Sequence, residues 1–465
     1  MADITKKENS IPRVMIAAPS SGSGKTVITM GLLEALKRRD LAPASFKCGP
    51  DYIDPMFHKR VLDVDCVNLD TFFSDASELK RTLNRYAGAV SVLEGVMGIY
   101  DGTGPDSVKG SCYETAEATG TPVILVMNAS GIGRTVIPLI KGILGDDRSC
   151  LIKGIILNRM SGKFYDKLLP HLEKEINELR PDVTILGHIP NDKRLNLDSR
   201  HLGLVMPKEM KDIGERIGNA ADLLEEYVSI EKILKIASSA GDINEPDRID
   251  LRAVPVKERV RLAVAEDEAF CFYYRENIRL LQDMGADIVR FSPLHDSSIP
   301  DGVSGLLIGG GYPELHLEEL SANTSMLGSV RGAIAGGMPS LAECGGFMYL
   351  HDTIAGPSGK EYGMVGLIKG KCFYTGHLVN FGYVEVCGTK DDNVRYLTGL
   401  RGHEFHYYDS TGGGIDVVLC RPSDKTKYEA MIAKPGRLWG FAHFYYPSDP
   451  EALYMFIKEM ERYGN

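Results

Sequence analysis

The chain has few features that would suit a membrane or a nucleic acid. No apolar run approaches the roughly 18 residues that a transmembrane helix needs. Acidic residues (63) outnumber basic ones (53), and the net charge of −10 argues against a general nucleic-acid or anionic-membrane binder. The polar N-terminal stretch MADITKKENSIPR has no apolar core, so no secretory signal is expected.

Cysteine pairs with metal or redox spacing are also missing. Nine cysteines are scattered over 465 residues, and none forms a C-x-x-C pair. An odd number cannot pair completely within one chain, and the spacing suits neither a zinc site nor a disulfide framework. We therefore expect a reduced cytoplasm as the setting.

Low-complexity segments and internal repeats are not evident, and the length favours two or three domains. In the first half, short β-type apolar runs alternate with helical patterns, which predicts an α/β fold with a parallel sheet covered on both faces. The predicted strands there are Arg13–Ala18, Ala89–Gly95, Pro122–Asn128, Ile152–Asn158 and Thr184–Pro190.

The alternation restarts at Val260, so we predict a first domain at 12–228 and a second α/β domain at 260–450. The intervening segment 229–259 is predicted as a linker. It contains the end of an amphipathic helix predicted for Lys208–Ser238, followed by a polar stretch rich in helix breakers.

The stretch APSSGSGKT lies between a predicted strand and a predicted helix, where backbone N–H groups can face phosphate oxygens. Pro19 replaces the glycine that usually stands five residues before the Gly-Lys pair. Lys25 would reach the β- and γ-phosphates of ATP, and the Thr26 hydroxyl would ligate Mg²⁺. The predicted ATP-binding residues of this loop are Gly22, Ser23, Gly24, Lys25 and Thr26. The alternative is a glycine-rich turn with an exposed lysine.

Four carboxylates follow predicted strands. Asp51 and Asp54 lie in FKCGPDYIDP, and Glu94 and Asp101 lie in VLEGVMGIYDG. Because sites in parallel sheets form at the carboxyl ends of strands, we expect all four beside the phosphate loop. There they could hold Mg²⁺ between ATP phosphates. The alternative is that some are solvated turn acids or helix caps.

A second site is predicted around Cys344, which follows one strand and precedes a probable helix. This strand–turn–helix elbow exposes a nucleophile, and a helix N-terminus would lower the cysteine pKa. Backbone amides of Gly310, Gly311 and Gly345 could stabilise an oxyanion. His443, at the end of a late apolar strand, is the candidate general base. The alternatives are a buried structural cysteine and a core histidine.

The stretch RGHEFHYY does not predict a zinc protease. That motif needs two histidines at i and i+4 on a helix, whereas His403 and His406 are three residues apart in a strand-like aromatic setting.

Taken together, these segments resemble the cobyrinate a,c-diamide synthase family of amidotransferases. The resemblance covers nearly the whole chain, in the family's order. The stretches that carry it are APSSGSGKT, FKCGPDYIDP, NLDTFF, LEGVMGIYDG, RHLGL, GGGYPE, ECGGFMYL, RGHEFHYY and AHF.

The resemblance implies an N-terminal P-loop domain similar to dethiobiotin synthetase and a C-terminal class I glutamine amidotransferase-like domain. It implies ATP- and Mg²⁺-dependent amidation of two corrin carboxylates, with glutamine as nitrogen source. Cys344 would be the glutaminase nucleophile and His443 its base. Ordinary class I glutaminases carry a glutamate two residues after this histidine, but here Tyr445 stands there.

The remaining roles are also implied by the resemblance. Thr26, Asp54 and Glu94 are assigned to Mg²⁺, and Asp51 and Asp101 to the acceptor carboxylate or its intermediate, with the division among the acids open. Asn158 is an adenine contact, and Arg200 and His201 are substrate contacts. The expected partners are small molecules, with no nucleic acid or membrane, and a homodimer is compatible with the sequence.

Two other functions stay open from the sequence. Ni-sirohydrochlorin a,c-diamide synthesis uses the same chemistry on another anionic tetrapyrrole with acetate side chains. A partition-type ATPase switch would account for the first half of the chain but gives Cys344 no role.

Overall fold

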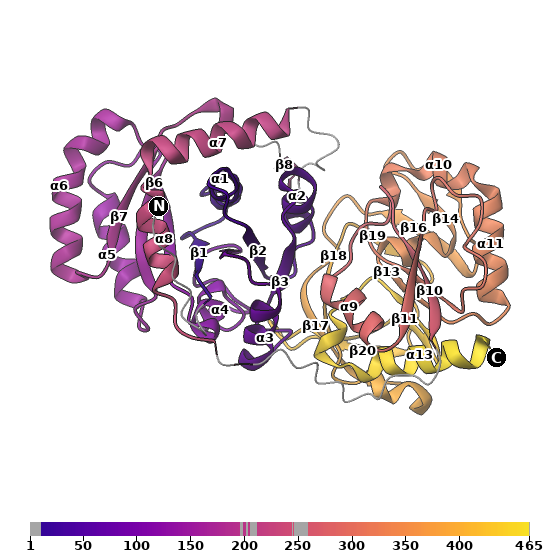
Figure 1. Ribbon diagram of the computed structural model, residues 1–465. Coiled ribbons are helices and arrows are strands. Elements are labelled where there is room, and N and C mark those ends of the chain that lie inside the picture. The colour runs from indigo at the N-terminus through magenta and orange to yellow at the C-terminus, as the bar shows by residue number, and fades with distance from the viewer. Residues whose placement is uncertain are drawn as a thin grey trace. The chain divides into compact units, whose positions relative to one another are not determined.

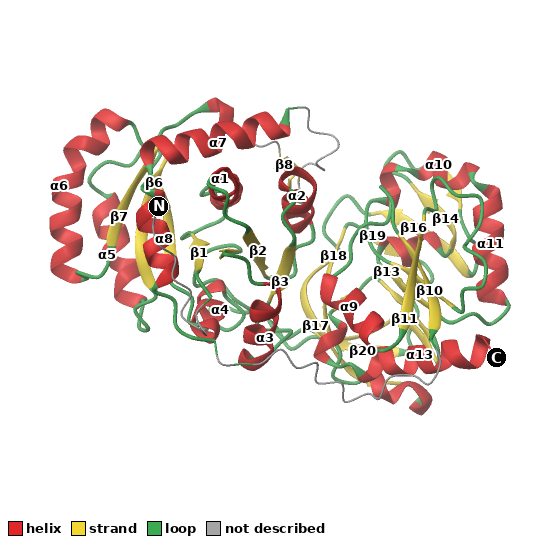
Figure 2. Cartoon of the chain, in the orientation of Figure 1, coloured by secondary structure: helices red, strands yellow, loops and turns green. Residues whose placement is uncertain are grey.

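Two units, residues 1–248 and 249–465, make up the chain, and each has its own core (Figure 1). This computed structural model describes residues 11–195, 199–200, 203–204, 212–243, 245 and 259–464. Strands lie inside each unit and helices lie around them (Figure 2). Within the described ranges, no helix is both long and apolar enough to cross a membrane.

The first unit is built on a seven-stranded sheet whose order is β3-β2-β4-β1-β5-β6-β7, with all neighbours parallel. The strands are β1 Arg13–Ala17, β2 Pro43–Cys48, β3 Cys66–Leu69, β4 Val90–Glu94, β5 Val123–Asn128, β6 Ile152–Asn158 and β7 Thr184–Ile189. Every residue of the central strand β1 is buried, as expected for a parallel sheet covered on both faces.

Helices cover both faces of this sheet. One face packs against α3 Ala76–Tyr86, α4 Cys112–Thr119, α5 Val136–Asp146 and α6 Gly162–Leu179. Contacts to the sheet are also made by α1 Lys25–Arg38, α2 Ile53–Leu62, α7 Ile213–Tyr227 and α8 Ile230–Ser238. A short hairpin pairs β8 Ser199–Arg200 with β9 Gly203–Leu204. The parallel arrangement places the carboxyl ends of β1, β2, β4 and β6 along one edge.

The second unit has a six-stranded sheet of order β11-β10-β12-β13-β23-β22, in which only the edge strand β22 is antiparallel among these described pairs. Its strands are β10 Val260–Ala265, β11 Ala286–Phe291, β12 Gly305–Ile308, β13 Ser340–Glu343, β22 Ile432–Lys434 and β23 Arg437–Gly440. The helices of the unit are α9 Arg275–Asp283, α10 Leu317–Ala322, α11 Thr324–Ala335, α12 Gly345–Tyr349 and α13 Glu451–Gly464.

Two smaller sheets account for the β-rich tail that the sequence predicts. One has the order β15-β14-β16-β19, and the other has the order β21-β20-β17-β18-β24. Their strands are β14 His351–Ala355, β15 Glu361–Gly363, β16 Ile368–Tyr374, β17 Asn380–Thr389, β18 Arg401–His406, β19 Tyr408–Ser410, β20 Val417–Cys420, β21 Lys427–Ala430 and β24 His443–Phe444.

The predicted strands of the first half correspond to β1, β4, β5, β6 and β7, with differences of one residue at most at their ends. The helix predicted for Lys208–Ser238 is instead two helices, and residues 208–211 lie outside the described part. Val228 is extended, and the Ser229 side chain accepts a hydrogen bond from the Lys232 N–H, which starts α8. Since α8 contacts β1, β4 and β6, residues 230–238 of the segment predicted as linker pack with the first unit.

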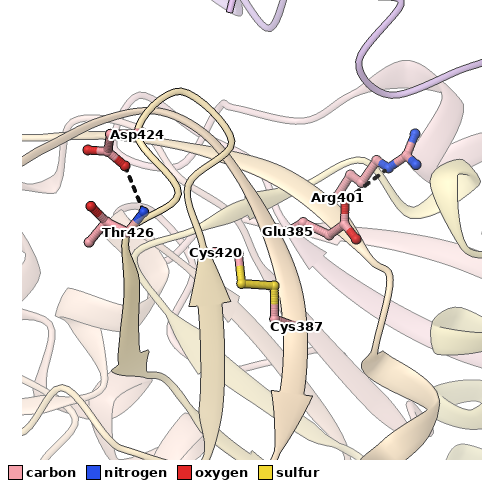
Figure 3. The surroundings of a disulfide bond; sticks show 6 residues. All are labelled: Glu385, Cys387, Arg401, Cys420, Asp424 and Thr426. Atoms are coloured by element: carbon pink, nitrogen blue, oxygen red, sulfur yellow. Dashed lines mark hydrogen bonds and ion pairs between the residues drawn. A yellow bond between two sulfur atoms is a disulfide. The ribbon is translucent and has the colours of Figure 1, made fainter.

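A disulfide joins Cys387 of β17 to Cys420 of β20, with the two Cα atoms 5.8 Å apart (Figure 3). The cysteine spacing predicted no disulfide framework, and this disulfide contradicts that expectation. The two cysteines are 33 residues apart and meet only because β17 and β20 pair antiparallel. The register of that pairing shifts between Val386 and Gly388, where Cys387 lies. Strand pairing of this kind leaves no trace in cysteine spacing.

Candidate functional site

The phosphate loop leaves β1 at Ala18 and enters α1 at Lys25. Gly22 and Gly24 have φ values of 74° and 96°, a backbone region that glycine adopts without strain. Lys25 is buried, and its Nζ donates to the carbonyls of Ser20 (3.2 Å) and Met97 (2.6 Å). The exposed lysine expected of a merely structural turn is therefore not what this loop contains.

Three of the predicted carboxylates gather around Lys47, on β2. Its Nζ lies 3.1 Å from Glu94 Oε1 and 3.8 Å from Asp51 Oδ2, and it also forms an ion pair with Asp54. The Thr26 hydroxyl donates to the same Glu94 Oε1 at 2.5 Å. The carboxyl ends of β2 and β4 and the start of α1 thus bring the acids beside the phosphate loop, as the sequence predicts.

Charge pairing decides the protonation of this cluster. Burial alone would raise the pKa of Glu94, but Lys47 and His58 lower it overall, so Glu94 stays ionised. Burial raises the pKa of Asp54 to about 8 against the opposing effect of Lys47. Lys47 itself stays charged, because Asp54 and Glu94 outweigh burial and raise its pKa. The pKa of Lys25 is lowered by burial and then by Lys47.

The other predicted residues of the first unit lie as follows. Asp101 is exposed, and its Oδ2 accepts the Gly98 N–H at 2.8 Å, on the same loop that offers Met97 to Lys25. Asn158 donates from Nδ2 to the Ser23 carbonyl at 2.8 Å, so it supports the phosphate loop directly. The backbone of Arg200 lies in β8, but the structure does not describe its side chain. His201 lies outside the described residues.

Lys47 and His58 belong to this site but were not predicted from the sequence. His58 Nε2 lies 3.3 Å from Glu94 Oε2, and its Nδ1 shares a 2.7 Å hydrogen bond with the Ser45 hydroxyl. Both residues are buried next to predicted acids. The signal that could have found Lys47 is a lysine inside a strand that is otherwise apolar or small, since a buried ammonium needs an anionic partner.

In the second unit, Cys344 occupies the predicted elbow between β13 and α12. Its φ of 47° and ψ of −103° are strained values for a residue with a side chain, and strain of this kind clusters at functional sites. The Cys344 N–H donates to the Gly440 carbonyl at 2.8 Å, which fixes the elbow against β23.

The predicted glycines line this elbow. A Cβ at Gly310 would lie 2.2 Å from His443 Cε1, so only glycine lets the imidazole approach so closely. A Cβ at Gly345 would lie 2.9 Å from Pro313 Cδ and 3.3 Å from the Gly311 nitrogen. The structure therefore brings the Gly310–Gly311 loop together with the elbow and His443.

The protonation of the Cys344–His443 pair differs from the sequence-based expectation. Burial, and then the Glu314 carboxylate, raises the pKa of Cys344, although the residue as a whole is only partly buried. The five-residue helix α12 does not offset this, so the predicted lowering was wrong. Burial lowers the pKa of His443, and His403 and His406 add to the effect. The resting pair is thus a neutral thiol and a neutral imidazole that can accept a proton.

The first six residues of the stretch RGHEFHYY form β18, and Tyr408 begins β19, so the stretch lacks the helix that a zinc-protease motif requires. The His403 ring stacks on His443, with centroids 5.1 Å apart and planes 17° apart. The hydroxyl of Tyr274 and His403 Nδ1 share a 3.0 Å hydrogen bond. Glu404 is buried and accepts a hydrogen bond from the Tyr428 hydroxyl. This strand therefore supports the imidazole of His443 from one side.

Both halves of the chain match family models. Residues 14–205 match the CobQ/CobB/MinD/ParA nucleotide binding domain, and residues 261–445 match the CobB/CobQ-like glutamine amidotransferase domain. These two matched segments contain the phosphate loop and the Cys344 elbow respectively.

Curated relatives match over most of the chain. A cobyrinate a,c-diamide synthase from Caldanaerobacter subterraneus subsp. tengcongensis is 36% identical over 97% of this chain and 98% of its own. A protein of the same name from Picrophilus torridus is 35% identical over 96% and 98%. Another, from Clostridium acetobutylicum, is 37% identical over 84% and 86%.

The buried Glu404 carboxyl predicts a pH-dependent stability. Burial raises its pKa to about 7 from 4.5, so the folded second unit loses stability as pH rises between these values. Glu404→Gln removes this loss. The stability difference between variant and wild type should therefore grow by about 3 kcal/mol from pH 4.5 to pH 8. Denaturant unfolding followed by fluorescence of Trp439, the single tryptophan, measures it in this unit.

Glu429→Gln, which changes an exposed glutamate on β21 of the same sheet, is the matched control. It tests whether loss of any glutamate charge has the same effect. A Glu404→Gln difference that stays constant with pH would contradict the prediction.

Proposed function

The chain belongs to the cobyrinate a,c-diamide synthase family, and on this premise we propose that it amidates the a and c acetate carboxylates of cobyrinate in cobalamin biosynthesis. ATP activates each carboxylate, and glutamine or ammonia supplies the nitrogen. The observation that carries the proposal is that one chain holds two such sites. One is a phosphate loop with a buried lysine beside the cluster of carboxylates around Lys47, and the other is a strained cysteine elbow beside a neutral histidine.

Carboxylates resist amine attack because oxide is a poor leaving group. In the proposed reaction the γ-phosphoryl group passes to the carboxylate and gives an acyl phosphate, whose phosphate leaves readily. This step depends on positioning and charge neutralisation. Lys25 and the loop amides would hold the phosphates, and Asn158 would keep the loop in place from β6. Asp51 and Asp101 would contact the acceptor or its intermediate, as would Arg200 and His201.

The oxygen donors at this site suit Mg²⁺. Thr26 Oγ1 and Glu94 Oε1 lie 2.5 Å apart, and Asp54 joins the same cluster through Lys47. Mg²⁺ prefers one or two carboxylates together with phosphate oxygens and water to a cage made wholly of protein. Thr26, Glu94 and Asp54 would hold the ion, which when bound neutralises phosphate charge. The Lys47 ammonium would offset the negative charge of the carboxylates that the ion does not neutralise.

Ammonia is released from glutamine at the second site. The Cys344 thiol gives its proton to His443, and the thiolate forms a thioester with the glutamine side chain. Water then releases glutamate. Amides of Gly310, Gly311 and Gly345 would stabilise the oxyanion. Local release matters because ammonia in water is mostly protonated and unreactive.

A direct test of the substrate compares cobyrinate with Ni-sirohydrochlorin, each with ATP, Mg²⁺ and glutamine. We expect mass spectrometry to find two amide substitutions on cobyrinate. Diamide formed only from Ni-sirohydrochlorin would reassign the substrate but keep the chemistry. ATP hydrolysis without amide product from either would instead favour the partition-type switch.

Cys344→Ala should abolish amidation with glutamine but retain it with high ammonia, because only the first route needs the thiolate. The measurement is product formation with each nitrogen source. Cys150→Ala, which removes an exposed thiol in the other unit, is the control and should keep both activities. Loss of both activities in Cys344→Ala would refute this division of labour.

Lys25→Ala should lose amidation with either nitrogen source, because Lys25 serves carboxylate activation. We expect a fall of roughly 100-fold or more in the rate, in line with the loss of a preorganised charge at a reacting phosphate. Lys232→Ala, at an exposed position on α8, is the control. Substantial amidation by Lys25→Ala would show that the loop does not bind the ATP phosphates.

Compartment and oligomeric state stay predictions. A cytoplasmic enzyme and a homodimer both fit the proposed chemistry. The Cys387–Cys420 disulfide is unusual for a reduced compartment, and thiol labelling of protein from intact cells would establish its state there.

A further inference from the structure

Glu343 directly precedes the nucleophile and ends the buried strand β13. Its register partner on β23 is Gly440, and His443 follows three residues later at the start of β24. Strand pairing therefore brings the carboxyl to the imidazole. Glu343 Oε2 lies 3.9 Å from His443 Nδ1, and both side chains are buried.

The carboxyl is held firmly on its other side. Glu343 Oε1 accepts the Tyr446 hydroxyl at 2.8 Å and the Phe444 N–H at 3.4 Å. Both donors lie within three residues of His443, so the carboxyl is tied to the segment that carries the base. Tyr446 is in turn fixed by its own N–H, which donates to Asn277 Oδ1 at 3.0 Å. A carboxyl so restrained can orient a neighbouring ring.

Ordinary class I glutaminases orient the imidazole with a glutamate two residues after the histidine, but this chain has no carboxylate at that position. Tyr445 stands there, buried, with its ring edge-on to Tyr274 at a centroid distance of 5.4 Å. The ring of His443 is further enclosed by Gly310 and by the stacked His403. Glu343, and not the residue at position 445, thus places a carboxylate oxygen at ion-pair distance from His443.

We infer that Glu343 is the third member of the glutaminase site, a positioning residue that orients His443 through Nδ1. This rests on the proposed glutaminase function. The distance of 3.9 Å exceeds a hydrogen bond, and such contacts tighten when substrate binds. Nδ1–H then donates to the carboxylate, which leaves Nε2 as the nitrogen that exchanges protons with Cys344.

The proton balance of the step follows. His443 Nε2 takes the Cys344 proton as sulfur bonds to the glutamine amide carbon. The resulting imidazolium is stabilised by the adjacent carboxylate. It returns the proton to the departing nitrogen when the C–N bond breaks, which gives ammonia and a thioester. Glu343 is not consumed and forms no bond to the substrate.

The test is steady-state kinetics of Glu343→Gln, Glu343→Asp and Tyr446→Phe. Glu343→Gln should lower kcat with glutamine by roughly 100- to 10,000-fold with little change in KM for glutamine, as expected when an orienting carboxylate is lost. Glu343→Asp should recover part of the loss, since it restores the charge. Tyr446→Phe, which keeps the carboxyl and frees one oxygen, should show a smaller fall in the same direction.

Amidation with ammonia is the internal control, and it should be unchanged in all three variants. Glu429→Gln is the control for loss of an exposed charge. Wild-type kcat in Glu343→Gln, or a change in KM alone, would overturn the inference. Equal loss with glutamine and ammonia would show a structural role instead. If wild-type protein itself released no glutamate from glutamine, the proposed function would fail rather than this inference.

Discussion

Parallel pairing of strands buried on both faces is the constraint on which both sites depend. Such strands end at a common edge, so residues far apart in sequence meet there without any local signal. In the first unit this edge gathers the loop after β1, Lys47 of β2 and Glu94 of β4. In the second unit the pairing of β13 with β23 gives Cys344 its elbow and brings His443 to Glu343.

The two sites treat buried charge in opposite ways. The first concentrates it: the Lys47 ammonium and the Glu94 carboxylate stay charged beside each other, while burial raises the pKa of the neighbouring Asp54. The second avoids it, because burial holds Cys344 and His443 neutral. This difference fits the tasks proposed for the two sites. Phosphoryl transfer needs charge in place beforehand, whereas a thiolate is needed only while glutamine is bound.

Motifs that require particular residues at consecutive positions, so that the backbone can turn sharply, could be predicted from the sequence. The phosphate loop needs glycines between a strand and a helix, and a nucleophile elbow needs a sharp turn after a strand, so both could be located by residue number. The residues that contact these motifs from other strands could not be predicted in this way. Lys47, His58 and Glu343 stand inside or beside the recognised motifs, but their roles come from register. The Cys387–Cys420 pair escaped prediction for the same reason, and the pKa of Cys344 because burial outweighs a short helix.

The position of Glu343 explains how a glutaminase site can lose the glutamate after its histidine and keep an orienting carboxylate. An imidazole constrains its partner by direction and distance, not by sequence position. A carboxyl two residues after the histidine and one at the end of the neighbouring strand can meet the same nitrogen. The second arrangement ties the carboxyl, the nucleophile and β13 into one rigid element. Tyr445 is then released to pack against Tyr274, the residue that also shares a hydrogen bond with His403 behind the imidazole.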